Sequence, residues 1–300
     1  MIVPNSSISA NKMQPVQKEI TIGKCCWISN YSWRPSKLFE GADMLLAIII
    51  NSPAKSSNSF VKSSIYQKWY NEYRKVLFQN IRYNDVTNCM IEGSIPKAPS
   101  ALCMNILQKL KKHAAGHSLQ ESFKVQSSYK LYYFRAVQYW FKVLDCEPIF
   151  EEDGVHKVTG EMKTIFAENE SMKNTLIAIL SSSVFFLNYI IWSSCQVVNN
   201  RDFNFYVDFK SISKDQLNDL STLGKELQKD YQKNSKIKTR SYSKKGRVFT
   251  MQKQHFFIKY SKCIINKIDL VLGSIFDLSE EEIDYIINYD IKYRMGDELE

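Results

Sequence analysis

Signature motifs of several common enzyme classes are missing from this 300-residue sequence. There is no glycine-rich phosphate loop, no GxGxxG and no HExxH, which argues against a P-loop nucleotidase, a dinucleotide-binding enzyme and a zinc metalloprotease. The sequence also has no Asn-Pro-Pro-aromatic or Asp-Pro-Pro-aromatic tetrapeptide. We therefore expect no catalytic residue in this chain.

Metal-binding patterns are scarce too. The seven cysteines include no CxxC pair, and the neighbours Cys25 and Cys26 would point to opposite faces of a strand. We expect reduced thiols, as in a cytoplasmic protein. His113 and His117 lie at i and i+4, which suits one face of a helix, but no third ligand is nearby. We predict surface histidines and no metal site.

Two segments bear on a membrane location. Met1 to Gln14 lacks the basic start and the long apolar core of a signal peptide. Thr175 to Trp192 carries no charge and is about long enough to cross a bilayer, but it contains polar residues and an apolar stripe at helical spacing. We expect a buried core helix there, a cytoplasmic protein and no membrane partner.

The chain is basic, with 40 Lys and Arg against 31 Asp and Glu, a net charge of +9 and a pI near 9.0. An excess of this size favours a polyanionic partner, either nucleic acid or an anionic membrane surface.

Two basic stretches favour nucleic acid. Residues 129–142 (YKLYYFRAVQYWFK) place Lys130, Arg135 and Lys142 among aromatic residues. This pattern indicates a strand or hairpin arm that either binds nucleic acid or covers its own rings with aliphatic stems. Residues 233–253 contain no acid and form either a basic hairpin or a disordered loop. Because two basic surfaces suit a protein that grips phosphates from more than one side, we predict that both bind phosphates. The candidates in the second stretch are Lys236, Lys238, Arg240, Lys244, Lys245 and Arg247.

The hydrophobic pattern predicts a mixed fold. Strands are expected at residues 1–7, 25–33, 44–52, 127–144 (a strand or hairpin arm) and 202–212. Helices are expected at residues 66–81, 100–116 and 213–234. Ser279 and Glu282 form a capping box ahead of a C-terminal helix.

Five segments, in order along the chain, carry a resemblance to a known family. They are residues 1–14, 27–50 (with Arg-Pro-Ser-Lys-Leu-Phe-Glu-Gly), 66–78 (with Trp-Tyr-Asn-Glu-Tyr-Arg), 177–192 and 278–296. On these segments the chain resembles the C-terminal part of DNA adenine-N6 methyltransferases of type IIG restriction–modification systems, which end in a TaqI-like specificity domain. In the fourth segment the family usually has Asn where this chain has Ser181.

The resemblance implies an α+β fold, in which the edge hairpin of a Rossmann-like methyltransferase sheet precedes a helical or mixed target-recognition domain. It implies three modules: residues 1–60 from the catalytic domain, residues 61–253 for DNA recognition, and residues 254–300 as a helical segment packed on the second. The family's S-adenosyl-L-methionine loop and Asn-Pro-Pro-Tyr motif lie upstream of the matching part and are missing here. We expect no cofactor bound by this chain alone, and S-adenosyl-L-methionine in the complete enzyme.

The resemblance also points to one base-stacking candidate. The family places an aromatic residue before its last strands to stack on a flipped adenine, and Phe39 falls at that position. The alternative is a core phenylalanine that fills the hairpin. Arg34 and Lys37 in the same motif are candidate DNA contacts.

The function expected from these observations is DNA binding. The resemblance implies a target-recognition subunit or fragment of an adenine-N6 DNA methyltransferase that binds double-stranded DNA and needs a partner chain for catalysis. Two alternatives remain: a stand-alone nucleic-acid-binding protein without enzymatic activity, and a decayed fragment of a split methyltransferase gene.

Overall fold

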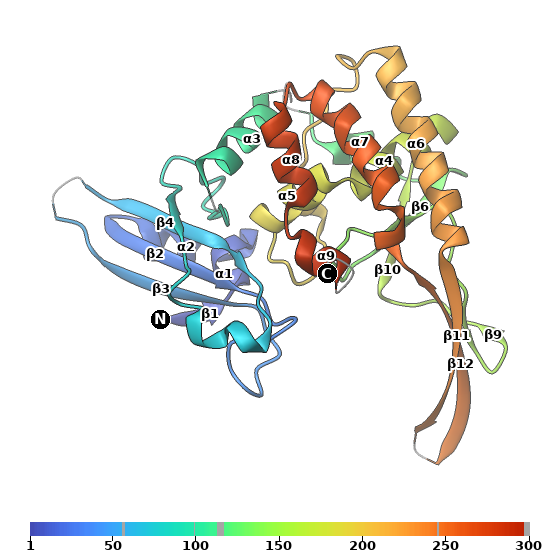
Figure 1. Ribbon diagram of the computed structural model, residues 1–300, viewed down its shortest axis with the longest axis horizontal. Coiled ribbons are helices and arrows are strands. Elements are labelled where there is room, and N and C mark those ends of the chain that lie inside the picture. The colour runs from blue at the N-terminus through green and yellow to red at the C-terminus, as the bar shows by residue number, and fades with distance from the viewer. Residues whose placement is uncertain (56–57, 99, 113–116, 245, 297–300) are drawn as a thin grey trace. The chain divides into compact units, whose positions relative to one another are not determined.

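A computed structural model describes residues 1–296, except residues 56–57, 99, 113–116 and 245 (Figure 1). It is a mixed α+β structure with 40% helix, 25% strand and three sheets, which confirms the predicted class. The chain forms two compact units, Met1–Lys111 with Leu187–Val198, and Lys112–Phe186 with Asn199–Glu300. We call them the N-terminal unit and the hairpin unit. The three functional modules inferred from the resemblance stay a prediction.

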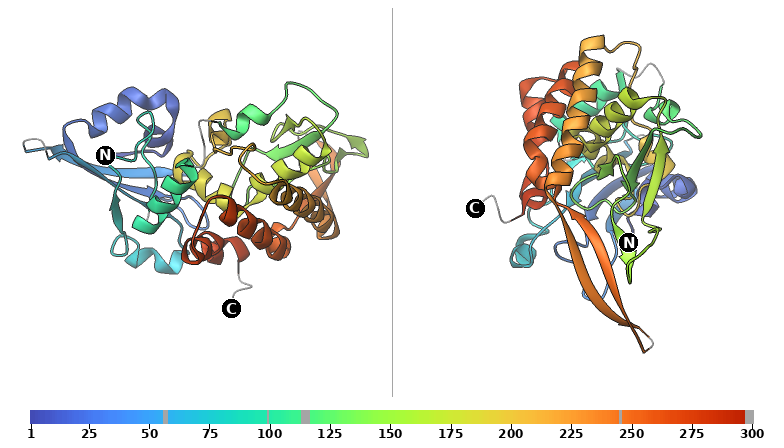
Figure 2. Two further views of the ribbon diagram at one scale, coloured as in Figure 1. Left: turned by 90° about the horizontal axis from the view of Figure 1, so that it is seen from above. Right: turned by 90° about the vertical axis from the view of Figure 1, so that its right-hand side faces the viewer.

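The N-terminal unit is built on a five-stranded sheet with strand order β1-β3-β2-β4-β5. The strands are β1 (Ile2–Pro4), β2 (Lys24–Tyr31), β3 (Leu46–Pro53), β4 (Phe60–Gln67) and β5 (Tyr83–Asp85). Among these described strands β2 and β4 pair in parallel, and the other neighbours pair antiparallel. Helices α1 (Ser6–Ser9) and α2 (Gln14–Thr21) cover one face of this sheet (Figure 2), and α3 (Ala101–Lys112) follows it.

The predicted strands at residues 25–33 and 44–52 are confirmed as β2 and β3. The strand predicted at residues 1–7 is confirmed only as the shorter β1, because residues 6 and 7 begin α1. The predicted helix at residues 66–81 is wrong. Its first residues end β4, where Tyr66 and Gln67 pair with β2, and a short 3₁₀ helix, η2 (Asn71–Val76), follows. Ladder pairing with β2 outweighs the local helical pattern because it satisfies backbone groups in the buried centre of the sheet.

The hairpin unit contains most of the helices and two smaller sheets. Its helices are α4 (Glu170–Ser181), the first residues of α5 (Ser183–Trp192), α6 (Lys214–Lys233), α7 (Lys262–Ile275), α8 (Glu280–Asn288) and α9 (Ile291–Met295). One sheet has the order β10-β6-β7, with β6 (Lys130–Phe134), β7 (Val143–Leu144) and β10 (Met162–Phe166). The other has the order β11-β12-β8-β9, with β8 (Phe150–Glu152), β9 (Val155–His156), β11 (Ser235–Lys244) and β12 (Arg247–Phe256).

Several predictions for this unit are confirmed. Residues 127–144 form a hairpin of β6 and β7, residues 213–234 form α6, and Ser279 with Glu282 caps α8. The predicted strand at residues 202–212 is wrong: η4 (Asn200–Phe203) and irregular chain occupy it. The rings of Phe203 and Phe205 pack on Phe185, with centroids 6.3 and 5.5 Å away, so ring packing decides the local conformation.

The apolar segment predicted as one core helix is buried, as expected, but it forms two helices. Among the described residues no single helix is long and apolar enough to span a membrane, and α4 and α5 reach that length only together, with a bend of 59°. The break between the two helices leaves the first N–H groups of α5 without carbonyl partners in α4. There the buried Asp269 carboxylate accepts hydrogen bonds from the N–H groups of Ser183 (2.7 Å) and Val184 (3.3 Å). Desolvation raises the pKa of Asp269 to about 6.

Helix packing in the hairpin unit yields a stability prediction at Gly224. A Cβ at Gly224 in α6 would lie 2.1 Å from the carbonyl oxygen of Asn174 in α4. Alanine normally stabilises a helix interior relative to glycine, but here the two helices would have to separate. We expect Gly224→Ala to lower the unfolding free energy by about 1–3 kcal/mol, as measured by urea denaturation.

Gly273 in α7 provides the matched control. Its Cβ would meet the Cδ1 atom of Ile283 at 2.2 Å, but that atom ends a side chain that is able to rotate. Gly273→Ala should therefore cost less than Gly224→Ala, and equal losses would contradict the packing argument.

Candidate nucleic-acid interface

The β11–β12 hairpin carries its charge on one face. Residues paired across an antiparallel ladder share a face, and the face alternates along each strand. Lys236 pairs with His255, Lys238 with Lys253, and Lys244 with Arg247, so these residues lie on one face together with Arg240. We call this the basic face. The opposite face carries no charge, since its members are Ser, Thr, Gln, Ile, Val and Phe.

The hairpin is accessible over most of its length. It extends away from the helices of its own unit (Figures 1 and 2), and every described residue of β11 from Lys236 to Lys244 is exposed. The rings of Tyr242 and Phe249 stack on the basic face, with centroids 5.7 Å apart and planes at 20°. The hairpin therefore presents cations together with a flat aromatic pair.

One predicted phosphate contact is engaged elsewhere. The guanidinium of Arg247 lies 3.0 Å from a carboxylate oxygen of Glu152 and 2.9 Å from one of Asp153. It ties the hairpin to β8. The hydrogen bond from the N–H of Thr250 lowers the pKa of Asp153, and the Arg247 guanidinium lowers it further. Lys236, Lys238, Arg240 and Lys244 make no ion pair among the described residues, and Lys245 lies outside them.

The electrostatics of His255 show that the cations converge at the base of the hairpin. Partial desolvation lowers the pKa of His255, and the positive charges of Lys238, Lys142, Arg240 and Lys253 lower it further. Lys142 comes from the aromatic stretch of residues 129–142. The fold therefore brings Lys142 of the first basic stretch close to several cations of the second.

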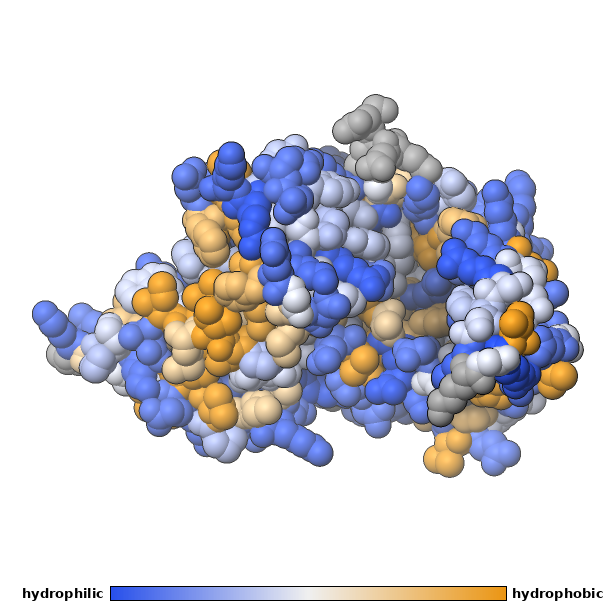
Figure 3. Space-filling view, turned by 90° about the horizontal axis from the view of Figure 1, so that it is seen from below, coloured by the Kyte–Doolittle hydropathy of each residue, from blue (hydrophilic) through white to orange (hydrophobic). Residues whose placement is uncertain are grey.

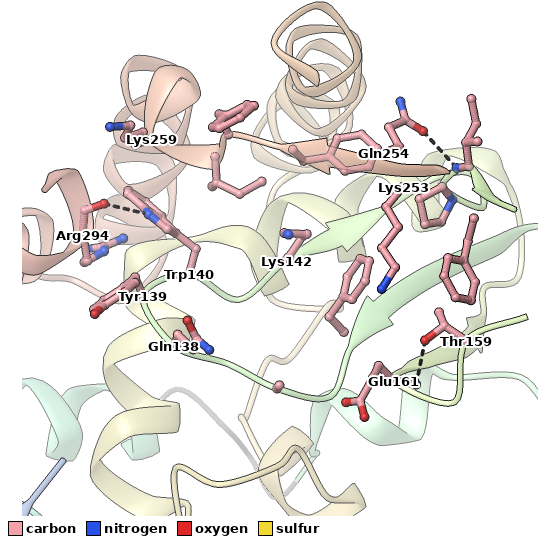
Figure 4. Close-up of a pocket in the computed structure, with 18 residues that line it drawn as sticks. Gln138, Tyr139, Trp140, Lys142, Thr159, Glu161, Lys253, Gln254, Lys259 and Arg294 are labelled. Carbon is pink, nitrogen blue, oxygen red and sulfur yellow. Dashed lines mark hydrogen bonds between the residues drawn. The ribbon is translucent and has the colours of Figure 1, made fainter. Parts of the chain in front are cut away.

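A pocket of about 560 Å³ opens beside this point (Figure 4). Its aromatic lining consists of Phe134, Tyr139, Trp140, Phe150, Phe256 and Phe257. Trp140 is held by α9: its ring N–H donates to the carbonyl oxygen of Arg294 (3.1 Å), and the Arg294 guanidinium lies 4.1 Å from the ring centroid. Lys142, from the loop just before β7, and Lys253, from β12, both point into the pocket (Figure 4).

The other candidates of this unit lie on β6 or next to it. Lys130 is exposed at the start of the strand, and Arg135 is half-buried just after its end. Of the three candidates in residues 129–142, the structure places only Lys142 in the pocket.

The motif containing Phe39 lies in the N-terminal unit, on the loop between β2 and β3. Phe39 is 42% exposed, so it does not fill the core, whereas the neighbouring Leu38 is 5% exposed and packs with Trp69. Arg74 braces the loop by donating to the carbonyl oxygens of Lys37 (2.7 Å) and Leu38 (2.6 Å).

The two cations of this motif are partly engaged. Lys37 pairs with Asp43, and Arg34 lies 4.2 Å from the ring centroid of Trp33. Exposed apolar residues of the same unit include Met44 and Phe78, and Figure 3 shows hydrophobic side chains gathered on one face of it.

The sequence analysis missed Lys253, His255 and the one-sided charge of the hairpin. The sequence does contain a pattern that predicts the one-sided charge. KIKTRSYSK alternates cationic or aromatic residues with neutral ones at the period of a strand. The pocket had no such pattern. Its walls come from segments more than a hundred residues apart, such as Trp140 and Arg294.

No metal centre is found among the described residues, because no group of three His, Cys, Asp or Glu side chains lies close enough to hold an ion. His113 lies outside them, and His117 pairs with Glu121 at 3.0 Å. No family model matches the sequence, and no curated protein matches it either.

The electrostatics of His255 generate a prediction about pH. The neighbouring cations lower its pKa, so a polyanion that neutralises them should raise it again. Binding then takes up a proton, and affinity for the polyanion should increase as the pH falls through the titration range of the histidine.

The measurement is an NMR titration of the histidine ring signals with and without a saturating short DNA duplex. His156, which lies 3.7 Å from Glu147, is the internal reference and should shift less. A pKa of His255 that does not change on saturation would show that phosphates do not approach the basic face.

Proposed function

We propose that this protein binds double-stranded DNA as the target-recognition subunit or fragment of an adenine-N6 DNA methyltransferase of a restriction–modification system. On this proposal it is catalytically incomplete alone, and a partner chain supplies the S-adenosyl-L-methionine site and the Asn-Pro-Pro-Tyr motif. The observation that carries the DNA-binding part is the one-sided charge of the β11–β12 hairpin.

A two-stranded ribbon with one cationic face suits duplex DNA on physical grounds. The major groove admits a two-stranded β-ribbon, and phosphate neutralisation supplies most of the affinity of DNA-binding proteins. Lys236, Lys238 and Arg240 lie in a row on the basic face. The neutral face carries hydroxyl and amide side chains, such as Thr239 and Gln252, which are able to hydrogen-bond base edges.

The methyltransferase part of the proposal is supported by the family resemblance and by Phe39. An enzyme that modifies a base must take it out of the stack, and an exposed ring is able to hold the flipped base. Phe39 is exposed on a loop that Arg74 and the buried Leu38 hold in place.

The second candidate is a stand-alone nucleic-acid-binding protein, since the hairpin favours DNA binding whether or not a partner exists. The two candidates differ in one result, which is whether a chain carrying the missing motifs restores methylation.

The decisive variant for DNA binding moves charge between faces without changing composition. K238T/T239K/R240S/S241R transfers two positive charges to the neutral face, and all four residues are exposed. If phosphates meet the basic face, the slope of log affinity against log salt should flatten by up to about 1.8 units. The measurement is fluorescence anisotropy of a labelled duplex at several salt concentrations.

K225A/K229A is the matched control, because it removes two exposed lysines from α6 in the same unit. It should leave the slope nearly unchanged. A face-exchange variant with the slope of the unmodified protein would mean that only net charge matters, and the proposed interface would be wrong.

Phe39 tests the methyltransferase part. With a partner chain that restores methylation, Phe39→Ala should leave duplex binding and the melting temperature nearly unchanged, since the ring is exposed. Turnover should fall about tenfold or more, because a stacked base gains about 1–3 kcal/mol. Phe39→Tyr should retain activity.

Leu38→Ala is the structural control. Its buried side chain should cost about 2–5 kcal/mol of stability, and the melting temperature should fall. If methylation per folded molecule is equal in Phe39→Ala and the unmodified protein, Phe39 has no stacking role.

A further inference from the structure

We propose that the pocket at the base of the β11–β12 hairpin binds an unpaired nucleotide, with its base against the aromatic walls and its phosphate between Lys142 and Lys253. This inference deepens the proposed function, and it rests on that function for the idea that a nucleic acid strand supplies the nucleotide. The ligand chemistry, a flat base with an attached phosphate, is also that of a free nucleotide.

The size and lining of the pocket suit such a ligand. Its volume of about 560 Å³ lies within the range of small-molecule sites, which are mostly apolar with a few convergent polar groups. Six aromatic residues line it, and aromatic faces stack on nucleic acid bases of any sequence. A base that is paired inside a duplex is covered on both faces by its neighbours, so only an unpaired base is able to enter.

Two lysines of the pocket, Lys142 and Lys253, have no ion-pair partner among the described residues. Lys142 is half-buried, its ammonium lies 4.8 Å from the ring centroid of Phe134, and it makes no ion pair among the described residues. Burial lowers the pKa of Lys142. Lys253 reaches in from β12, with its ammonium 5.1 Å from the ring centroid of Phe150. A desolvated cation is costly without a counter-charge, and a phosphate placed between the two ammonium groups would supply one.

The stacking surface is already in place. Trp140 is fixed by its hydrogen bond to the Arg294 carbonyl and by the guanidinium packed on its ring. Arg294 is itself 3% exposed and donates to the hydroxyl of Ser183 at 3.0 Å. Because the ring is ordered before a ligand arrives, stacking on it costs little conformational entropy.

The rim of the pocket contains one carboxylate. Glu161 is exposed at the opening, and its backbone N–H donates to the hydroxyl of Thr159 at 3.2 Å (Figure 4). Its negative charge disfavours a phosphate next to it. A carboxylate is able to accept hydrogen bonds from the exocyclic amino group of adenine or cytosine.

The test uses the full chain and three probes: 2′-deoxyadenosine 5′-monophosphate, a duplex with one unpaired adenine, and the same duplex fully paired. The variants are Lys142→Gln and Lys253→Gln. Lys225→Gln is the control, since Lys225 is exposed on α6 of the same unit and does not line the pocket. Calorimetry measures the affinities, and thermal melting checks the folding of each variant.

We expect the mononucleotide to bind, and both test variants to weaken it about ten- to hundred-fold, since each removes a charged contact. Lys225→Gln should change it less than threefold. The duplex with the unpaired adenine should bind more tightly than the paired duplex, and Lys142→Gln should abolish that difference while affinity for the paired duplex changes little.

The other outcomes separate the pocket from the hairpin. Mononucleotide binding without a preference for the unpaired adenine would overturn the strand as the source and leave a free nucleotide as the ligand. Mononucleotide binding without any duplex binding would overturn the proposed function, while the pocket would still be a nucleotide site. No mononucleotide binding, or equal affinity in folded Lys142→Gln, would overturn the pocket as a nucleotide site.

Discussion

Much of the structure depends on one constraint: the buried backbone N–H and C=O groups at the two ends of α5 need hydrogen-bond partners. The helix is almost wholly apolar. The hydroxyl of Ser182, directly before it, accepts a hydrogen bond from the N–H of Phe185 (3.0 Å), but other terminal N–H and C=O groups need partners from distant segments. In the hairpin unit the carboxylate of Asp269 accepts the first N–H groups. In the N-terminal unit the buried ammonium of Lys97 donates to the carbonyl oxygens of Ile191 (3.1 Å) and Ser193 (2.6 Å). An anion at the N-terminus and a cation at the C-terminus also complement the helix dipole.

The residues around the start of α5 also contact the candidate site. Arg294, whose positive charge lies close enough to Asp269 to counter the rise of its pKa, donates to the Ser183 hydroxyl and packs on Trp140. The C-terminal helix α9, which supplies Arg294, thus positions a wall of the pocket. One buried residue of α9 therefore connects the start of α5 with the Trp140 wall of the pocket.

The hairpin and the pocket are complementary surfaces of one unit. The hairpin presents exposed cations at strand spacing, which suits long-range attraction to phosphates and depends on salt. The pocket presents the half-buried Lys142, the exposed Lys253 and fixed rings, which suits a single short-range contact. Arg247 lies on the basic face, but its charge is already paired. It pairs with Glu152 and Asp153 and so fixes the hairpin on β8.

The sequence alone determined the fold class, most strands of the N-terminal sheet, helix α6 and the capping box of α8. These features depend on short-range periodicity and on capping chemistry that neighbouring residues complete. It also located the basic stretches, because charge composition is visible in any segment. Tertiary structure alone decided that residues 66–81 are not a helix, since Tyr66 pairs with a distant strand. Only tertiary structure decided that Phe39 is exposed while Leu38 is buried, and that Trp140, Lys142 and Lys253 line one pocket. Which side chains meet depends on long-range packing, and no local pattern encodes contacts between segments a hundred residues apart.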